Sequence, residues 1–193
     1  LGLAKEMARP NMEDMRAGFT DVGVGGTPPT WSGKGGNPWL EPWRAKSADL
    51  SLEHYFGKAS YVALAGFYKK LDTFVYTHTT RYDFTGFPNP STLEPPSNIG
   101  NLDAPANGKG GVVKGLELSL ALEAGRIVQA LDGFGLVGSL SWNASNLHEG
   151  NDPNKPLDGL SGRVDGLTLY YEKHGLSARV SERGRTQFTT IVR

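Results

Sequence analysis

Apolar and polar side chains alternate along much of this chain with a period of two, the pattern of strands that have one apolar face. The most regular run is residues 112–123, in which every second position from 116 to 122 is a leucine: Leu116, Leu118, Leu120 and Leu122. An amphipathic helix would not repeat leucine at a spacing of two. Residues 163–181 show the same alternation in two runs, and the Lys173-His174-Gly175 link between them is short enough only for a hairpin. These segments therefore predict antiparallel strands.

The pattern predicts about seven strands in all. They cover residues 1–9, 47–56, 60–76, 112–123, 134–143 and the two arms of the hairpin in 163–181. Pro10, followed by Asn11 and two acidic residues, predicts one short helix over residues 11–17. Polar segments rich in Gly, Pro and Asn predict long loops at 18–46, 77–111 and 144–162. Because these long connections alternate with short ones, an up-and-down meander would place all of the long loops at one end.

A sheet with one apolar and one charged face fits two architectures. In a soluble β-sandwich the polar face meets water, whereas in a membrane barrel the apolar face meets lipid and the polar face lines the lumen. The segregation of loop lengths favours the barrel, as do strands longer than the usual five or six residues or so. We therefore predict an all-β fold, an antiparallel up-and-down meander that forms part of a large transmembrane β-barrel. The alternative is a soluble β-sandwich that binds carbohydrate.

The composition narrows the classes of protein to which this chain can belong. The formal net charge is zero, which gives no indication of nucleic-acid binding. The chain has 193 residues and no cysteine, which excludes a disulfide framework and a thiolate metal site. No apolar run is long enough for a transmembrane helix, but barrel strands need only about 9–11 residues with alternate positions apolar. The chain starts without methionine and ends in TQFTTIVR, which looks like a strand, so we expect it to be part of a longer protein.

Several segments resemble TonB-dependent outer-membrane receptors. In that family a "GNP-L-P" stretch leads into "LEYYF", a turn and "AGFYKKI--F", and residues 36–74 of this chain follow the same order. The matching residues are Gly36, Asn37, Pro38, Leu40, Pro42, Leu52, Glu53, Tyr55, Phe56, Ala65, Gly66, Phe67, Tyr68, Lys69, Lys70 and Phe74. Residues 167–181 resemble the family's "LALYYEK-GFSARVS", and the start of the chain resembles a "TRP---DL" segment. The resemblance extends over nearly the whole chain.

The resemblance implies a plugged barrel of 22 strands in the outer membrane of a Gram-negative cell. It implies a receptor and transporter, not an enzyme, that takes up a scarce nutrient such as a siderophore, cobalamin or a carbohydrate. The closest likeness is to receptors of carbohydrate-scavenging proteobacteria. Residues 1–193 would be a partial barrel domain from the C-terminal half, without the plug domain or the terminal strand. The implied partners are outer-membrane lipid, the plug domain of the same protein, the nutrient, and TonB through the missing N-terminal part.

Six charged residues fall on the polar faces of the predicted strands. A charge on the lipid face costs about 2–4 kcal/mol at mid-membrane, so their restriction to one face is informative. We expect them to face the lumen, where they would line a substrate path or contact the plug; the alternative is a merely hydrated face. They are Glu53, Glu117, Glu123, Glu172, Arg179 and Arg183. The four histidines are scattered, and no arrangement of residues suggests a catalytic site, a metal site or a cofactor.

Six aromatic residues lie in two of the predicted long loops: Trp31, Trp39, Trp43, Tyr82, Phe84 and Phe87. Aromatic rings in exposed loops can stack on sugar or chelate rings, so these six are the candidate ligand contacts. They could equally pack the loops internally. Other aromatics near predicted strand ends, among them Tyr68, Trp142 and Tyr171, fit interfacial girdles, or simply the preference of aromatics for strands.

Overall fold

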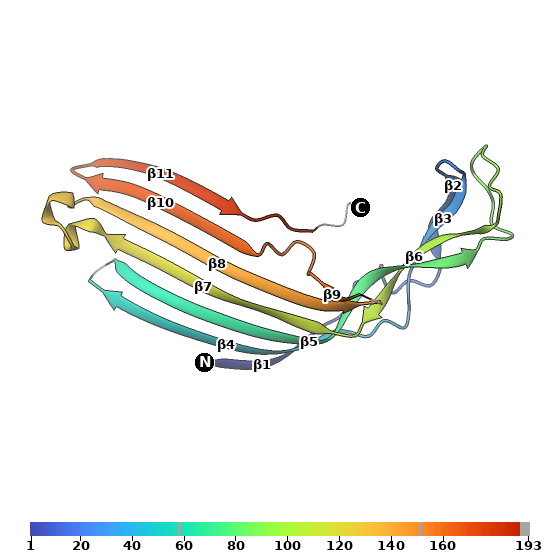
Figure 1. Ribbon diagram of the computed structural model, residues 1–193, viewed down its shortest axis with the longest axis horizontal. Coiled ribbons are helices and arrows are strands. Elements are labelled where there is room, and N and C mark those ends of the chain that lie inside the picture. Colours follow the sequence, from blue (N-terminus) through green and yellow to red (C-terminus); the bar gives the residue numbers. More distant parts are fainter. Residues whose placement is uncertain (58, 151, 190–193) are drawn as a thin grey trace.

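The chain folds into one long, curved sheet of eleven strands, seen in a computed structural model that describes residues 1–57, 59–150 and 152–189 (Figure 1). Seven strands lie side by side, each antiparallel to the next, and we call them the wall. In spatial order they are β1 (Gly2–Ala8), β4 (Trp43–Phe56), β5 (Ser60–Asp83), β7 (Gly111–Glu123), β8 (Phe134–Glu149), β10 (Arg163–Lys173) and β11 (Leu176–Arg185). The predicted all-β antiparallel meander is therefore confirmed.

The remaining strands project from one end of the wall (Figure 1). They are β2 (Phe19–Gly25), β3 (Thr30–Gly35) and β6 (Ile99–Gly108), which together with residues 74–83 of β5 form what we call the extension. Within it β3 runs parallel to β6. The short strand β9 (Asp152–Lys155) pairs with the end of β8. At the opposite end of the wall, two 3-10 turns (Ala124–Arg126 and Gln129–Leu131) join β7 to β8.

Cross-strand pairing collects the predicted leucines on one side of the wall, which we call the leucine face. Its central row runs from Leu52 through Leu64 and Leu118 to Leu140 and then reaches Asp165 of β10, because residues directly opposite in an antiparallel pair share a face. Large apolar side chains on this face stay well exposed, with Leu52 at 63% and Leu116 at 55%. In the part of the chain that the structure describes, no second sheet packs over these leucines, as a β-sandwich would require.

The connections separate by length as the sequence predicts. The links between β4 and β5, β7 and β8, and β10 and β11 all lie at the end of the wall away from the extension (Figure 1). The longer links, which contain β2, β3, β6 and β9, lie at the other end. No helix among the described residues is both long and apolar enough to cross a membrane.

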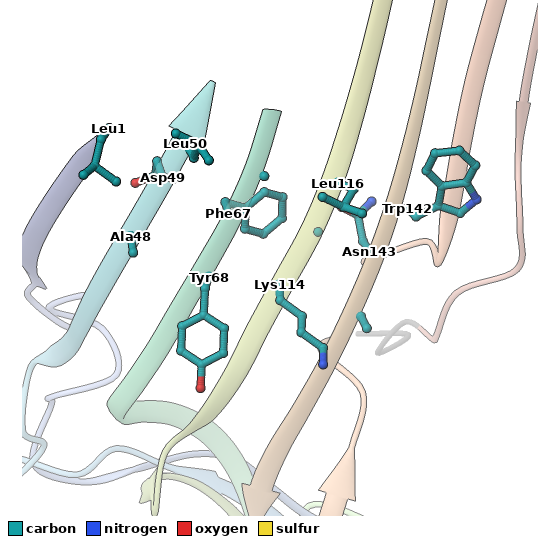
Figure 2. A pocket seen from close by; sticks show the side chains of 13 residues that line it. Leu1, Ala48, Asp49, Leu50, Phe67, Tyr68, Lys114, Leu116, Trp142 and Asn143 are labelled. Carbon is teal, nitrogen blue, oxygen red and sulfur yellow. The ribbon is translucent and has the colours of Figure 1, made fainter. Parts of the chain in front are cut away.

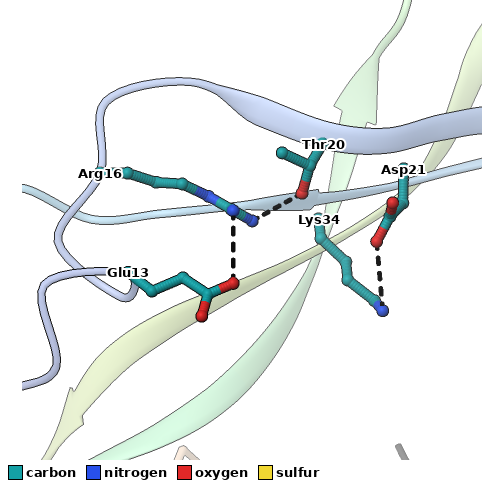
Figure 3. Close-up of polar contacts among 5 residues, drawn as sticks. All are labelled: Glu13, Arg16, Thr20, Asp21 and Lys34. Atoms are coloured by element: carbon teal, nitrogen blue, oxygen red, sulfur yellow. Dashed lines mark hydrogen bonds and ion pairs between the residues drawn. The ribbon is translucent and has the colours of Figure 1, made fainter.

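The predicted helix over residues 11–17 is wrong. Residues 12–15 form a turn with bonds from Met15 N to Met12 O and from Arg16 N to Glu13 O, 3.2 and 3.3 Å long. The Arg16 guanidinium then donates to Thr20 Oγ1 at 2.6 Å and lies 3.6 Å from Glu13 Oε1 (Figure 3). Nearby, Lys34 pairs with Asp21 across the β2–β3 hairpin. These contacts of Arg16 link the turn to the start of β2, and no helix forms over residues 11–17.

The predicted long loops at 18–46 and 77–111 are also wrong as loops, since they contain β2, β3, β6 and the ends of β4 and β5. In the sequence, Pro105 argues against a strand at 99–108, because proline has no backbone N–H to donate to a neighbouring strand. The strand tolerates it since β3 pairs only with Asn101–Asp103, so β6 has a single neighbour at Pro105. The third loop is shorter than predicted, because β8 runs on to Glu149. At the C-terminal end β11 stops at Arg185; residues 186–189 are outside any strand, and 190–193 lie outside the described residues.

Candidate functional site

The six predicted lumen residues lie together on the side opposite the leucines, which we call the polar face. One row runs from Glu53 through Ala63, Ser119, Ser139 and Gly166 to Arg183. The other four charged residues alternate onto the same side: Glu117, Glu123, Glu172 and Arg179. Five of the six are exposed, and Glu123 is half-buried. The two-residue period therefore puts all six on one face, as the sequence predicts; that this face lines a lumen stays a prediction.

Three of these charges line one hollow of about 720 Å³ at the short-turn end of the polar face: Glu123, Glu172 and Arg179. Asp132, from the link between β7 and β8, forms part of the same rim and accepts a hydrogen bond from Lys173 Nζ at 2.8 Å. The Lys173 ammonium lowers the pKa of Asp132, first by that hydrogen bond and then by its charge. The hollow therefore combines fixed charges of both signs and suits a polar protein surface or a hydrated solute.

A second hollow, of about 370 Å³, lies where the wall meets the extension, and we call it the junction cleft. Its aromatic lining is Trp43, Phe74 and Tyr76. Trp43 is the first residue of β4 and does not lie in a loop. Its ring centroid lies 6.0 Å from the ring centroid of Phe74. The lining also contains Arg9 and three acidic residues, Asp14, Glu149 and Asp158, and Glu149 pairs with Lys155. Phe74 is buried, so the cleft offers the half-buried Trp43 and Tyr76 rings beside charges of both signs, a combination that suits hydroxyl-rich solutes.

Four of the six candidate aromatic residues instead form the core of the extension. Phe84 is fully buried and Trp31 is 4% exposed, with their rings stacked at 5.6 Å. Tyr82 and Phe87 pack edge-on to Phe84 at 5.0 and 5.6 Å. Trp31 and Tyr82 also lie in strands β3 and β5 and not in loops. Internal packing, the alternative interpretation, therefore describes Trp31 and Phe84, whose rings have no free face in this structure.

Trp39 is the candidate that faces solvent, with 88% of its surface exposed. Its loop is held firmly from both sides. Asn37 accepts a bond from Trp39 N at 3.0 Å and donates to Pro105 O at 3.1 Å. Asn107 of β6 exchanges two bonds with the backbone of Glu41, 2.9 and 3.0 Å long. The two asparagines were not predicted as site residues; the Asn in the "GNP" segment was the one available signal.

One comparison with known proteins gives a match, and that match agrees with this geometry. No curated protein and no solved structure matches the chain. Among the described residues, no group of three or more His, Cys, Asp or Glu is placed to hold a metal ion. A family model described as "TonB dependent receptor-like, beta-barrel" matches residues 1–190. A meander with one leucine face, one charged face and long excursions at a single end is the wall of such a barrel, and the chain belongs to the TonB-dependent receptor β-barrel family.

Proposed function

We propose that this chain forms part of the wall of an outer-membrane nutrient transporter, with its polar face toward the lumen. The TonB-dependent receptor family to which it belongs consists of such receptors, with a plug domain and TonB as general partners. The observation that supports the proposal is the division of side chains between two faces of the sheet across β4, β5, β7 and β8. Leucines occupy every second position of β7 from 116 to 122, while Glu53 and Glu117 lie on the other side. On β10 and β11 the division is less strict, because Asp165 and Glu182 share the leucine face.

We further propose that the two hollows have different partners. The hollow around Glu123, Glu172 and Arg179 lies at the short-turn end, which faces the periplasm in outer-membrane barrels, so it contacts the plug domain. The junction cleft and Trp39 lie at the long-loop end, so they receive the nutrient from outside. The ring faces of Trp43, Tyr76 and Trp39 suit a carbohydrate or the aromatic part of a chelate.

The orientation can be tested by cysteine labelling of a receptor that carries no other cysteine; residues 1–193 contain none. Leu118 and Ser119 are adjacent on β7 and point to opposite faces. In the complete receptor in intact outer membranes, a charged maleimide should label Ser119→Cys and spare Leu118→Cys. The opposite result would show that the leucine face meets water and would refute the proposal. Labelling of both would do the same.

The ligand assignment has its own test. Trp39→Ala removes an exposed indole that the fold does not use, whereas Phe87→Leu alters the packed cluster of the extension. We expect Trp39→Ala to weaken ligand binding to the complete receptor while the protein reaches the outer membrane at the normal level. Uptake and binding of candidate siderophores, cobalamin and oligosaccharides would name the substrate. Unchanged affinity for the true substrate in Trp39→Ala and Trp43→Ala would remove these residues from the site.

A further inference from the structure

Lysines border the leucine face at the end nearest the extension. Lys5, Lys46 and Lys70 are direct cross-strand neighbours on β1, β4 and β5. Lys114 on β7 lies one row nearer the leucines, directly opposite Tyr68. Like charges that face each other across strands destabilise a sheet, so this arrangement favours a bound anion. Among the ion pairs of the described residues one involves this set, between Lys46 Nζ and Asp72 Oδ2 at 3.5 Å.

An apolar groove of about 540 Å³ has Lys114 in its lining, and Lys70 lies one row farther from the leucines (Figure 2). Gly66 lies in the row between Leu50 and Leu116 and lines the groove; a Cβ at this position would lie 3.2 Å from Leu116 Cδ2. The walls are half exposed, with Leu50 at 52% and Trp142 at 48%. Figure 2 shows the Tyr68 hydroxyl and the Lys114 ammonium extended in the same direction, away from the level of Leu116. Lys114 thus holds its charge at the edge of the apolar surface.

We propose that the groove and the lysine row bind one phosphorylated membrane lipid, with an acyl chain over Gly66 and the phosphate against Lys70 and Lys114. The inference rests on the proposed orientation, in which the leucine face meets lipid. Charge complementarity identifies the occupant, because a cationic row at the edge of an apolar band matches a headgroup phosphate above its chains. A second copy related by an axis normal to the membrane would bring a second lysine row to the same level, which is unfavourable.

The test uses the complete receptor, purified from outer membranes in mild detergent, delipidated, and titrated with diphosphoryl lipid A under native mass spectrometry. Lys70→Gln/Lys114→Gln should weaken binding about 30-fold, since each lysine near an anionic lipid surface contributes a factor of about five. The matched control is Lys34→Gln/Lys109→Gln, which removes the same charge at two exposed positions away from the groove and should bind normally. Gly66→Val fills the groove, retains the lysines and should also weaken binding.

Three outcomes would overturn the inference. Equal binding by the lysine variant and its control would show that these lysines do not hold the phosphate. Equal binding of lipid A from which both phosphates have been removed would show the same. A lysine variant that changes the oligomeric state and leaves lipid affinity intact would identify a second copy as the occupant. Each result is read from protein recovered in the outer membrane, so it refutes the lipid site alone; failure to reach that membrane would refute the proposed function.

Discussion

An arginine at the centre of the leucine face should disrupt assembly of the barrel, and the structure sets the size of the effect. On the leucine face, β7 is apolar between Lys114 and the 3-10 turn that starts at Ala124. Those ten or so residue steps span about 34 Å along the strand, or about 26 Å of membrane depth at the usual tilt near 40°. This height matches the apolar band of about 25 Å in outer-membrane barrels. Leu118 lies about 10 Å below the Lys114 boundary and is therefore close to the midplane.

Leu118→Arg should destabilise the folded barrel by about 2–4 kcal/mol, a change of about 30- to 900-fold in the folding equilibrium. Ser119→Arg is the matched control, because its neighbours Ala63 and Ser139 are small and its face is polar. Tyr68→Arg, beside Lys114 at the boundary, should cost no more than about 1 kcal/mol. The measurement is the urea dependence of the folded fraction of the complete receptor in lipid vesicles. Equal costs at Leu118 and Ser119, or the reverse order, would refute the assignment of the faces.

Three further outcomes follow from single contacts. Phe84→Ala should destabilise the extension by about 3–5 kcal/mol, because it empties a fully buried site, and should admit protease to residues 84–98; Trp39→Ala, at an exposed ring, should not. Gly115→Ala would place a methyl carbon 2.6 Å from the Phe67 ring and should cost about 1–3 kcal/mol in urea titrations, whereas Gly25→Ala meets no atom within 4 Å and should be neutral. Because Lys173 lowers the pKa of Asp132, this pair stabilises the fold above the unfolded pKa of about 3.9, and the contribution disappears as the pH falls through the lower, folded value. Asp132→Asn should therefore flatten the dependence of stability on pH below about pH 4; an unchanged slope would show that the pair is not formed.

The wall could be predicted from the sequence because its signal is local. Each strand carries its own alternation, so Leu116–Leu122 and the arms of the 163–181 hairpin identify their faces without knowledge of any neighbour. The charged residues of the polar face followed for the same reason. Cross-strand pairing then places Glu53 and Arg183 in one row, five strands apart, which the sequence alone could assign to a face but not to a shared row.

The extension could not be predicted, since its strands depend on contacts between distant residues. Trp31, Phe84 and Leu102 form one buried cluster but come from three separate segments rich in Gly, Pro and Asn. Those compositions are typical of loops, and packing overrode them. The burial of the six candidate aromatic residues likewise depends on contacts with residues far away in the sequence. Nothing local distinguishes Trp31, which is buried, from Trp39, which is exposed, because the difference lies in what the rest of the chain packs against each ring.

The glycines within the wall show why register carries information that composition does not. Phe67 lies directly opposite Gly115, and Tyr170 lies directly opposite Gly135, in both cases on the polar face. Each ring lies close over the glycine of its neighbouring strand, where a Cβ would collide with it. Side chains on a sheet otherwise stand roughly perpendicular to it. A ring that lies along the sheet covers backbone and projects less into the space in front of the polar face. Glycines that suggest loops in a single sequence thus keep two large rings out of the volume that a plug would occupy.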